Sequence, residues 1–253
     1  MSFEKSRKRG PVETGRKMTP VFATMIGGEQ MRAFLLAMGA VVVLVLVSLT
    51  LVDVPVARFV HTLPWAQNLR SPALGLPVLV TLSGVAIFCG ALLVANGHVP
   101  HKLQEILIVA SFSLTSSVCI DELLLKRFFG RETPDEFLQG GVDAFNWFQG
   151  TPNTAFPSGH AVQIVSVGTV FLLAYPRQRA AWLTLMGVGL IALVLGNWHF
   201  VSDVVAGTGV GASAGIATTV LWRAKSRSGT TAIAERISPD MMTPAKSLTR
   251  EPQ

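Results

Sequence analysis

The feature that most constrains this chain is a series of apolar runs of about 18 residues or more, long enough to cross the ~30 Å hydrocarbon core of a bilayer as helices. Only 14% of the 253 residues are charged, against about 25% in an average soluble domain. The mean hydropathy is +0.48. These properties exclude an ordinary soluble globular domain, a disordered chain and a disulfide-rich secreted module. We therefore expect an all-α, polytopic membrane protein.

The apolar segments predict a bundle of six transmembrane helices, and they cover about residues 33–54, 74–96, 103–125, 158–175, 182–199 and 203–222. The first segment is too long and too β-branched for a cleaved signal peptide, and no A-x-A site follows it. We expect a membrane domain over 32–222. The tails, 1–31 and 223–253, are rich in Ser, Thr, Pro and charge and are expected to be disordered.

The distribution of basic residues predicts the orientation in the cell inner (plasma) membrane. The net charge of +6 arises largely in the two tails, and the positive-inside rule therefore puts both termini in the cytoplasm. By the same rule, the short basic loops near residues 98–102 and 177–179 are expected in the cytoplasm. The loops 55–73, 126–157 and 199–202 are then expected outside. No aromatic–basic patch accompanies the charge, which argues against nucleic acid as a partner.

Small residues within the apolar segments have structural interpretations. Cys89 and Cys119 are predicted to be small core residues, not a disulfide or a metal pair. Gly207, Gly211 and Gly215 recur every four residues in the last segment. Such a stripe lets two helix backbones approach closely in a membrane, and we assign it no chemistry.

Three polar clusters lie at the ends of predicted spans. Lys126 and Arg131 follow the third span, Pro-Ser-Gly-His at 157–160 opens the fourth, and His199 and Asp203 lie between the fifth and the sixth. The chain crosses the membrane twice between the two histidines, so both reach the same, outer face. A chance Pro-Ser-Gly-His match in a chain of this length is on the order of one in a thousand, whereas a lone His-x-x-x-Asp is weak.

The first two clusters suit phosphate binding. Ser158 is a good N-cap, and Gly159 lets backbone N–H groups at a helix N-terminus approach an anion. Lys126 and Arg131 supply positive charge for phosphate oxygens. The alternative is that Lys126 and Arg131 only anchor the protein at the membrane interface.

The histidines suit the chemistry of phosphoryl transfer. If His199 and Asp203 share a helical turn, the carboxylate holds one ring nitrogen and leaves the other as a nucleophile. His160 could protonate the leaving oxygen. This scheme needs no metal or other cofactor. Asp121 and Glu122, near the end of the third span, could either hydrogen-bond locally or face the site.

The clusters resemble the three signature motifs of the type 2 phosphatidic acid phosphatase superfamily, which also contains vanadium haloperoxidases and bacterial acid phosphatases. The family pattern is Lys-x6-Arg-Pro, Pro-Ser-Gly-His and Ser-Arg-x5-His-x3-Asp, and the likeness covers about residues 103–222. The resemblance implies a histidine nucleophile, a general acid and an orienting carboxylate, which would be His199, His160 and Asp203. It also implies a phosphate cradle of Lys126, Ser158 and Gly159.

Two motifs depart from the family pattern. The family arginine of the first motif falls on Thr133, although Pro134 is in place and Arg131 lies two positions earlier. The Ser-Arg pair of the third motif falls on Ala192 and Leu193. Each missing charged hydrogen bond would cost about 1.5–3 kcal/mol, or roughly 10- to 150-fold in rate.

We therefore predict an integral membrane phosphatase that hydrolyses a phosphomonoester or pyrophosphate of a lipid at the outer leaflet through a phosphohistidine. Candidate substrates in a bacterium are undecaprenyl pyrophosphate, phosphatidylglycerophosphate, phosphatidic acid and a lipid A phosphate. The aromatic residues of the 126–157 loop suit the membrane interface. The alternative is a catalytically degenerate protein that only binds lipid phosphate. A transporter is less favoured, because no pair of interrupted half-helices is visible.

Overall fold

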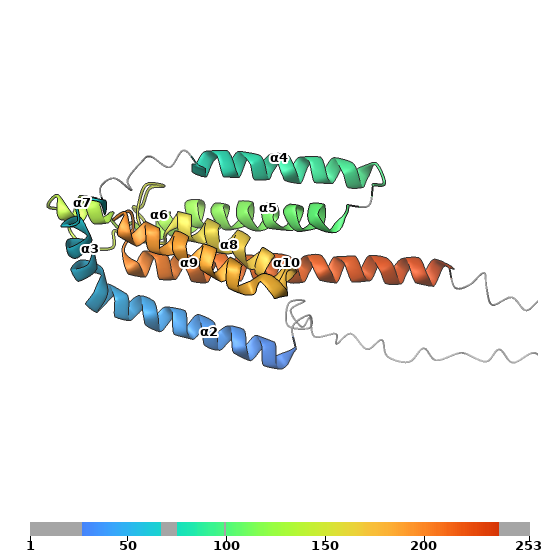
Figure 1. Ribbon diagram of the computed structural model, residues 1–253, viewed down its shortest axis with the longest axis horizontal. Coiled ribbons are helices and arrows are strands. Elements are labelled where there is room, and N and C mark those ends of the chain that lie inside the picture. Colours follow the sequence, from blue (N-terminus) through green and yellow to red (C-terminus); the bar gives the residue numbers. More distant parts are fainter. Residues whose placement is uncertain (1–26, 67–74, 99, 238–253) are drawn as a thin grey trace, which may run out of the picture.

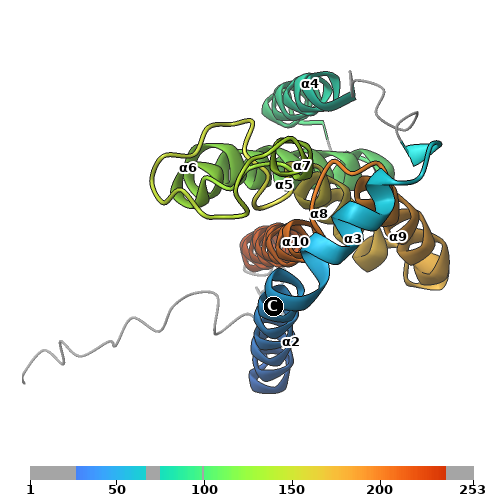
Figure 2. The ribbon, with the colours of Figure 1, turned by 90° about the vertical axis from the view of Figure 1, so that its left-hand side faces the viewer.

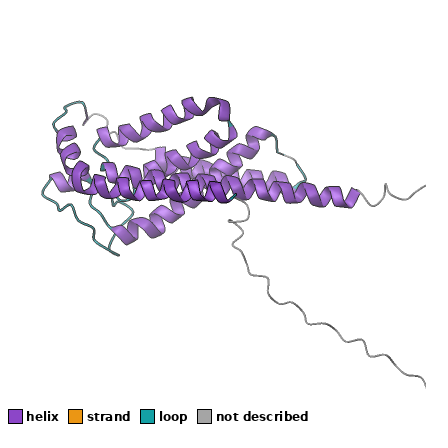
Figure 3. Cartoon of the chain, turned by 90° about the horizontal axis from the view of Figure 1, so that it is seen from below, coloured by secondary structure: helices purple, strands orange, loops and turns teal. Residues whose placement is uncertain are grey.

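The computed structural model describes residues 27–66, 75–98 and 100–237, and every regular element in these ranges is helical (Figures 1 and 3). The predicted all-α class is confirmed for this part of the chain. Each predicted apolar segment corresponds to one long helix: α2 (Gly28–Val47), α4 (Gly75–Ala95), α5 (Lys102–Ile120), α8 (Gly159–Ala174), α9 (Arg179–Leu195) and α10 (Val201–Ile237). These helices run side by side along the long axis of the molecule.

Four helical stretches are long and apolar enough to cross a membrane: Gly28–His61, Lys102–Phe129, Pro176–Leu195 and Val201–Lys225. The other two predicted spans contain the shorter apolar stretches Leu82–Leu93 and Gly159–Ala174. With 16 residues, α8 is roughly 24 Å long at 1.5 Å per residue. Length and composition therefore support a membrane protein with four spans and do not by themselves establish six.

Helix α8 is the centre of the bundle, and it packs against α5, α9 and α10. The glycine stripe of α10 lies close to the backbone of α8. A Cβ atom on Gly207 would lie 2.6 Å from the carbonyl oxygen of Ser158, and one on Gly211 would lie 2.5 Å from that of Val162. Gly215 is similarly close to α8. The predicted small-residue packing is confirmed, and its partner helix is α8.

The outer surface of the bundle is apolar, as expected for a surface that faces lipid. Leu36 is 75% exposed, Phe88 65% and Leu185 62%. Cys89 and Cys119 are free cysteines and both are exposed, so the prediction that they belong to the core is wrong. In a membrane protein the lipid-facing surface is as apolar as the core, and hydrophobicity alone does not distinguish them.

Two helices extend past the boundaries predicted for the membrane domain. Helix α2 begins at Gly28 instead of 32, and α10 continues beyond 222 to Ile237. Arg223, Ala224 and Lys225, which follow Trp222, have high helix propensity, and a helix already formed in the bundle propagates at little cost. Most of the predicted disordered tails, residues 1–26 and 238–253, lies outside the described residues.

Helix α3 (Asp53–His61) covers one end of the bundle. It follows a π-helical turn, Ser48–Val52, and crosses from the end of α2 towards α9 (Figure 2). Pro55 lies one turn after Leu51, and a proline ring clashes with the carbonyl four residues earlier, which accounts for the widened turn and the change of direction.

The connections alternate between the two ends of the bundle as predicted. The end covered by α3 also carries α6 (Lys126–Phe129), α7 (Pro134–Leu138) and the first residues of α8. The α4–α5 and α8–α9 connections lie at the opposite end. The clusters that were predicted to share one face of the membrane therefore lie at one end of the molecule.

Candidate active site

The rings of His160 and His199 lie beside each other at the beginning of α8, with their centroids 5.9 Å apart and their planes inclined by 59°. His160 is the second residue of α8, whose N-cap is Ser158; the Ser158 hydroxyl accepts a hydrogen bond from the Ala161 N–H at 3.3 Å. The predicted N-cap is confirmed. The ring of Trp198 contacts that of His160 at 5.4 Å between centroids.

His199 lies in the turn between α9 and α10, two residues before α10 begins. The condition that His199 and Asp203 share a helical turn is therefore not met, because the chain reverses here through Asn197, whose φ is 54°. Asparagine tolerates this left-handed conformation better than most residues. The turn still brings His199 Nδ1 to 3.8 Å from Asp203 Oδ2, and Nδ1 has no hydrogen-bond partner in the described part of the chain.

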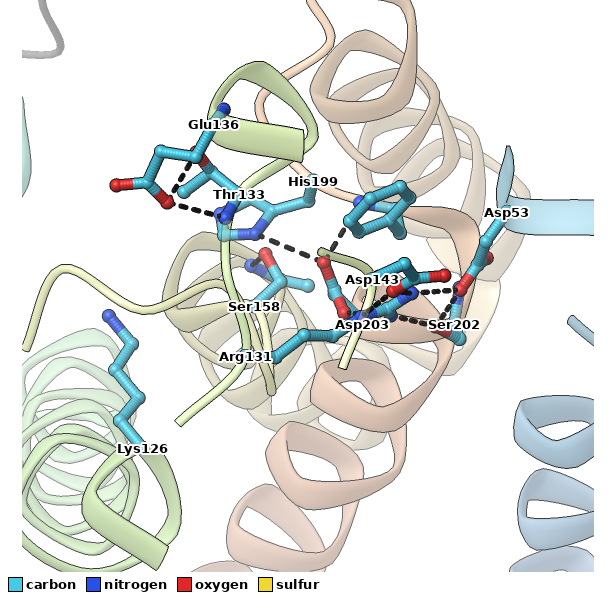
Figure 4. Close-up of polar contacts among 12 residues, drawn as sticks. Asp53, Lys126, Arg131, Thr133, Glu136, Asp143, Ser158, His199, Ser202 and Asp203 are labelled. Carbon is cyan, nitrogen blue, oxygen red and sulfur yellow. Dashed lines mark hydrogen bonds and ion pairs between the residues drawn. The ribbon is translucent and has the colours of Figure 1, made fainter. Parts of the chain in front are cut away.

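Asp203 is held on both of its carboxylate oxygens (Figure 4). Oδ1 accepts from Arg131 Nη1 at 2.8 Å, and Oδ2 accepts from the Phe200 N–H at 2.8 Å. The Ser158 N–H donates to the Asp203 carbonyl at 3.0 Å. This backbone hydrogen bond joins the start of α8 to the first turn of α10, and it fixes the two histidine-bearing segments relative to each other.

Lys126, Ser158 and Gly159 come together as the predicted phosphate cradle requires. A Cβ atom on Gly159 would lie 3.4 Å from Lys126 Nζ. The ammonium donates to Glu122 Oε1 at 2.9 Å and to the Pro152 carbonyl at 2.7 Å. Lys126 is therefore fixed beside the N-terminus of α8, where backbone N–H groups favour an anion.

Asp121 also reaches this helix terminus. Its Oδ2 would lie 2.9 Å from a Cβ atom on Gly159, and the residue is 1% exposed. Neither carboxyl oxygen accepts a hydrogen bond from any described residue. Of the two interpretations left open by the sequence, the one in which Asp121 faces the site is therefore the one that the structure supports.

Arg131 occupies a different position from the predicted phosphate ligand. Its side chain is fully buried, and its five N–H groups all donate to protein oxygens on Asp53, Asp143, Ser202 and Asp203 (Figure 4). Burial by itself lowers the pKa of Arg131, but Asp203, Asp143 and Asp53 outweigh it and hold the pKa above its ordinary value. Arg131 thus contacts Asp203, the carboxylate that was predicted to orient His199, and has no free N–H group for phosphate.

Sequence reasoning missed three members of this cluster: Asp53, Asp143 and Ser202. Asp53 carried a usable signal, because a carboxylate at the end of an apolar run is costly unless it has a partner.

Thr133 was interpreted from the sequence only as the position of a missing arginine. In the structure Thr133 is the N-cap of α7, and it forms a capping box with Glu136. The Thr-Pro-x-Glu pattern is a sequence signature of such a cap.

The loop between α7 and α8 packs tightly on the end of α6. A Cβ atom on Gly130, which has φ 60°, would lie 2.3 Å from the Asn146 carbonyl oxygen. Aromatic rings cover this contact, with Phe128 and Trp147 centroids 5.2 Å apart. Trp147 is 50% exposed and Phe148 78%. These exposed rings are among the aromatic residues of the 126–157 loop that were predicted to suit the membrane interface.

A pocket of about 250 Å³ lies beside the histidines, and it is lined by Thr133, Asp135, Asn197 and Trp198. Its lining offers a hydroxyl, a carboxylate, an amide and an indole ring. Among the described residues, no group of three His, Cys, Asp or Glu side chains is placed to hold a metal ion.

Comparison with known proteins supports the resemblance found in the motifs. Residues 106–227 match the family model described as the PAP2 superfamily. A lipid A 1-phosphatase of Rhizobium johnstonii is 35% identical over 101 residues, which are 39% of this chain and 41% of that protein. A lipid A 1-phosphatase of Rhizobium etli is 34% identical over 101 residues, covering 39% and 43%. The match thus spans less than half of each relative, and no solved structure matches significantly.

Proposed function

We propose that this chain, a member of the PAP2 superfamily through residues 106–227, is an integral membrane phosphatase that hydrolyses a phosphomonoester or pyrophosphate of a lipid. The observation that carries the proposal is the pair of neighbouring rings, His160 and His199, with Asp203 behind His199. Binding a phosphate requires cations and N–H groups. A nucleophile, an acid and an orienting carboxylate in one place are needed only for catalysis.

In the first step, His199 Nε2 attacks phosphorus, because Nδ1 is turned towards Asp203. The N–P bond forms and the P–O bond to the lipid breaks, while His160 transfers its proton to the leaving oxygen. The product is a phosphohistidine. In the second step, neutral His160 removes a proton from a water whose oxygen attacks phosphorus. The N–P bond then breaks, and inorganic phosphate leaves.

The charge on the transferred phosphoryl group is met by Lys126 and by the N–H groups at the start of α8. The cations expected from the family at the positions of Thr133 and Leu193 are absent. This absence is the observation that favours the alternative, a degenerate protein that binds lipid phosphate without hydrolysing it. The intact histidine pair favours the enzyme.

We further propose six spans, with both termini in the cytoplasm and the active site at the periplasmic face of the inner membrane. Helix α4, at 21 residues, has the length of a span. Although α8 is short, it is surrounded by other helices and has little contact with lipid. The exposed Trp147 and Phe148 suit the outer interface, and the basic residues of the tails favour the cytoplasm.

For the substrate we propose a phosphate carried by a sugar headgroup. The relatives with matching residues are lipid A 1-phosphatases. The pocket beside the histidines supports the same class, because hydroxyl, carboxylate and amide groups bond sugar hydroxyls while an indole ring packs on a sugar face.

The test is phosphate release by the purified full-length protein in detergent from lipid A 1-phosphate, undecaprenyl pyrophosphate, phosphatidylglycerophosphate and phosphatidic acid. We expect the highest kcat/KM for the sugar phosphate, persistence of activity in EDTA and inhibition by vanadate, which mimics a five-coordinate transition state. His98→Ala serves as the control, since His98 is an exposed residue of the α4–α5 connection. Binding of the lipids without release, and without a phosphoenzyme, would establish the alternative.

A further inference from the structure

The cluster around Arg131 connects the candidate nucleophile to a helix outside the family match. Asp53 begins α3, and the family match starts at residue 106. The side chains of Asp53 and Arg131 are both 0% exposed. A carboxylate and a guanidinium in such a place are each costly unless they are paired and fully hydrogen-bonded, so their geometry is tightly determined.

Asp53 binds both neighbours of Asp203 (Figure 4). Its Oδ2 accepts from Arg131 Nη2 at 2.9 Å and also from the Ser202 hydroxyl. Its Oδ1 accepts from the Ser202 N–H at 2.9 Å. Asp53 therefore fixes the guanidinium and the first turn of α10 at once, and Ser202 in turn accepts from Arg131 Nη1 at 2.7 Å.

Asp143 holds the same guanidinium from the opposite side. It accepts from Arg131 Nε at 3.0 Å and from Nη2 at 2.7 Å, and its own side chain is 21% exposed. Arg131 Nη1 is then left to Ser202 and to Asp203 Oδ1. Because the guanidinium is rigid and planar, fixing Nε and Nη2 also fixes the direction in which Nη1 donates.

From these contacts we propose that Asp53 is a positioning residue for catalysis, acting on His199 through Arg131 and Asp203. The inference rests on the proposed function. Helix α3 thus contributes to the active site through Asp53. Asp53 acts through Arg131 and Asp203 and not through a direct contact with either histidine. Loss of the Asp53 charge frees one side of Arg131 and lets the Asp203 carboxylate turn away from His199 Nδ1. Phosphate binding at Lys126 and α8 is left intact.

The test compares Asp53→Asn, Asp203→Asn and the double variant in the full-length protein. The number of active sites is counted from the phosphoenzyme, so that misfolded protein does not lower kcat. We expect Asp53→Asn to lower kcat by about 10- to 100-fold, with KM within about twofold. The kcat of the double variant should equal that of Asp203→Asn within about twofold. The effects of substitutions along one chain of contacts are not additive, because each breaks the same connection. Glu29→Gln, an exposed acid of α2, is the matched control.

Asp143→Asn provides a second route to the same answer if Asp53→Asn does not fold. It loosens Arg131 from the partly exposed side, and the same loss in kcat without a change in KM is expected. If the wild type is active but kcat is unchanged in Asp53→Asn, the inference is overturned and the proposed function stands. The same holds if the losses of the two single variants add up in the double variant. An inactive wild type without a phosphoenzyme would overturn the proposed function and this inference with it.

Discussion

At the scale of single residues, the proposed mechanism gives the two histidines different tasks, and their substitutions should have different consequences. His199→Ala removes the nucleophile, so we expect no phosphoenzyme and a loss in kcat of about 10³-fold or more. His160→Ala removes only the acid, which typically contributes about 10²- to 10⁴-fold. Its effect should be smaller for a pyrophosphate, whose leaving group needs less protonation. Steady-state rates on both substrate classes, with His98→Ala as control, decide this. Equal losses on both substrates would contradict the assignment of His160.

Asp121 is the residue whose position is hardest to reconcile with an anion site. A carboxylate that accepts no hydrogen bond from the described residues, beside Gly159 and 1% exposed, repels a phosphate when it is charged. We therefore predict that Asp121→Asn, which removes the charge and keeps the shape, leaves kcat near the wild-type value and lowers KM or leaves it unchanged. Initial rates over a range of lipid phosphate concentrations measure both constants. A fall in kcat/KM of more than about tenfold would mean that the carboxyl takes part in the reaction.

At the scale of the helices, sequence patterns predicted what depends on near neighbours. The positions of the helices, the Ser158 cap and the glycine stripe follow from residues within one or two turns, whereas the ends of α2 and α10 differ from the predicted boundaries. The partners of Arg131 could not be predicted in this way, because Asp53 and Ser202 are distant in sequence and meet only where α3 crosses the bundle. That crossing depends on the bend after α2. The turn at Asn197 likewise replaced the regular helix expected between His199 and Asp203.

The contact between α8 and α10 should be sensitive to the size of its small residues. We predict that Gly211→Leu destabilises the protein by at least about 1–3 kcal/mol, because its Cβ would lie 2.5 Å from the Val162 carbonyl oxygen. The shift of α8 should also reduce activity, since Ser158 caps that helix and His160 lies in its first turn. Gly187→Leu on α9 is the control, as a Cβ atom there meets nothing within 4 Å. Thermal unfolding in detergent compares the two, and equal melting temperatures would refute close packing at Gly211.

At the scale of the whole molecule, the candidate site and the aromatic loop share one end, and the basic extension of α10 leaves from the other. This difference between the two ends of the molecule suits an enzyme that takes its substrate from one leaflet only. The apolar outer surface fixes the depth of the bundle in the bilayer. The aromatic edge at Trp147 and Phe148 would then lie at the level of the headgroups, where a lipid phosphate is found.

The orientation gives the last prediction. In a background with Cys89→Ala and Cys119→Ala, a cysteine at Val142, which is 68% exposed in the loop near the site, should react with a membrane-impermeant maleimide in intact cells. A cysteine at Lys225, exposed on the far part of α10, should react only after the cells are opened, because the proposed orientation puts that basic end in the cytoplasm. Labelling of Lys225→Cys but not Val142→Cys in intact cells would put the histidines on the cytoplasmic side, where they would meet newly made lipids before export.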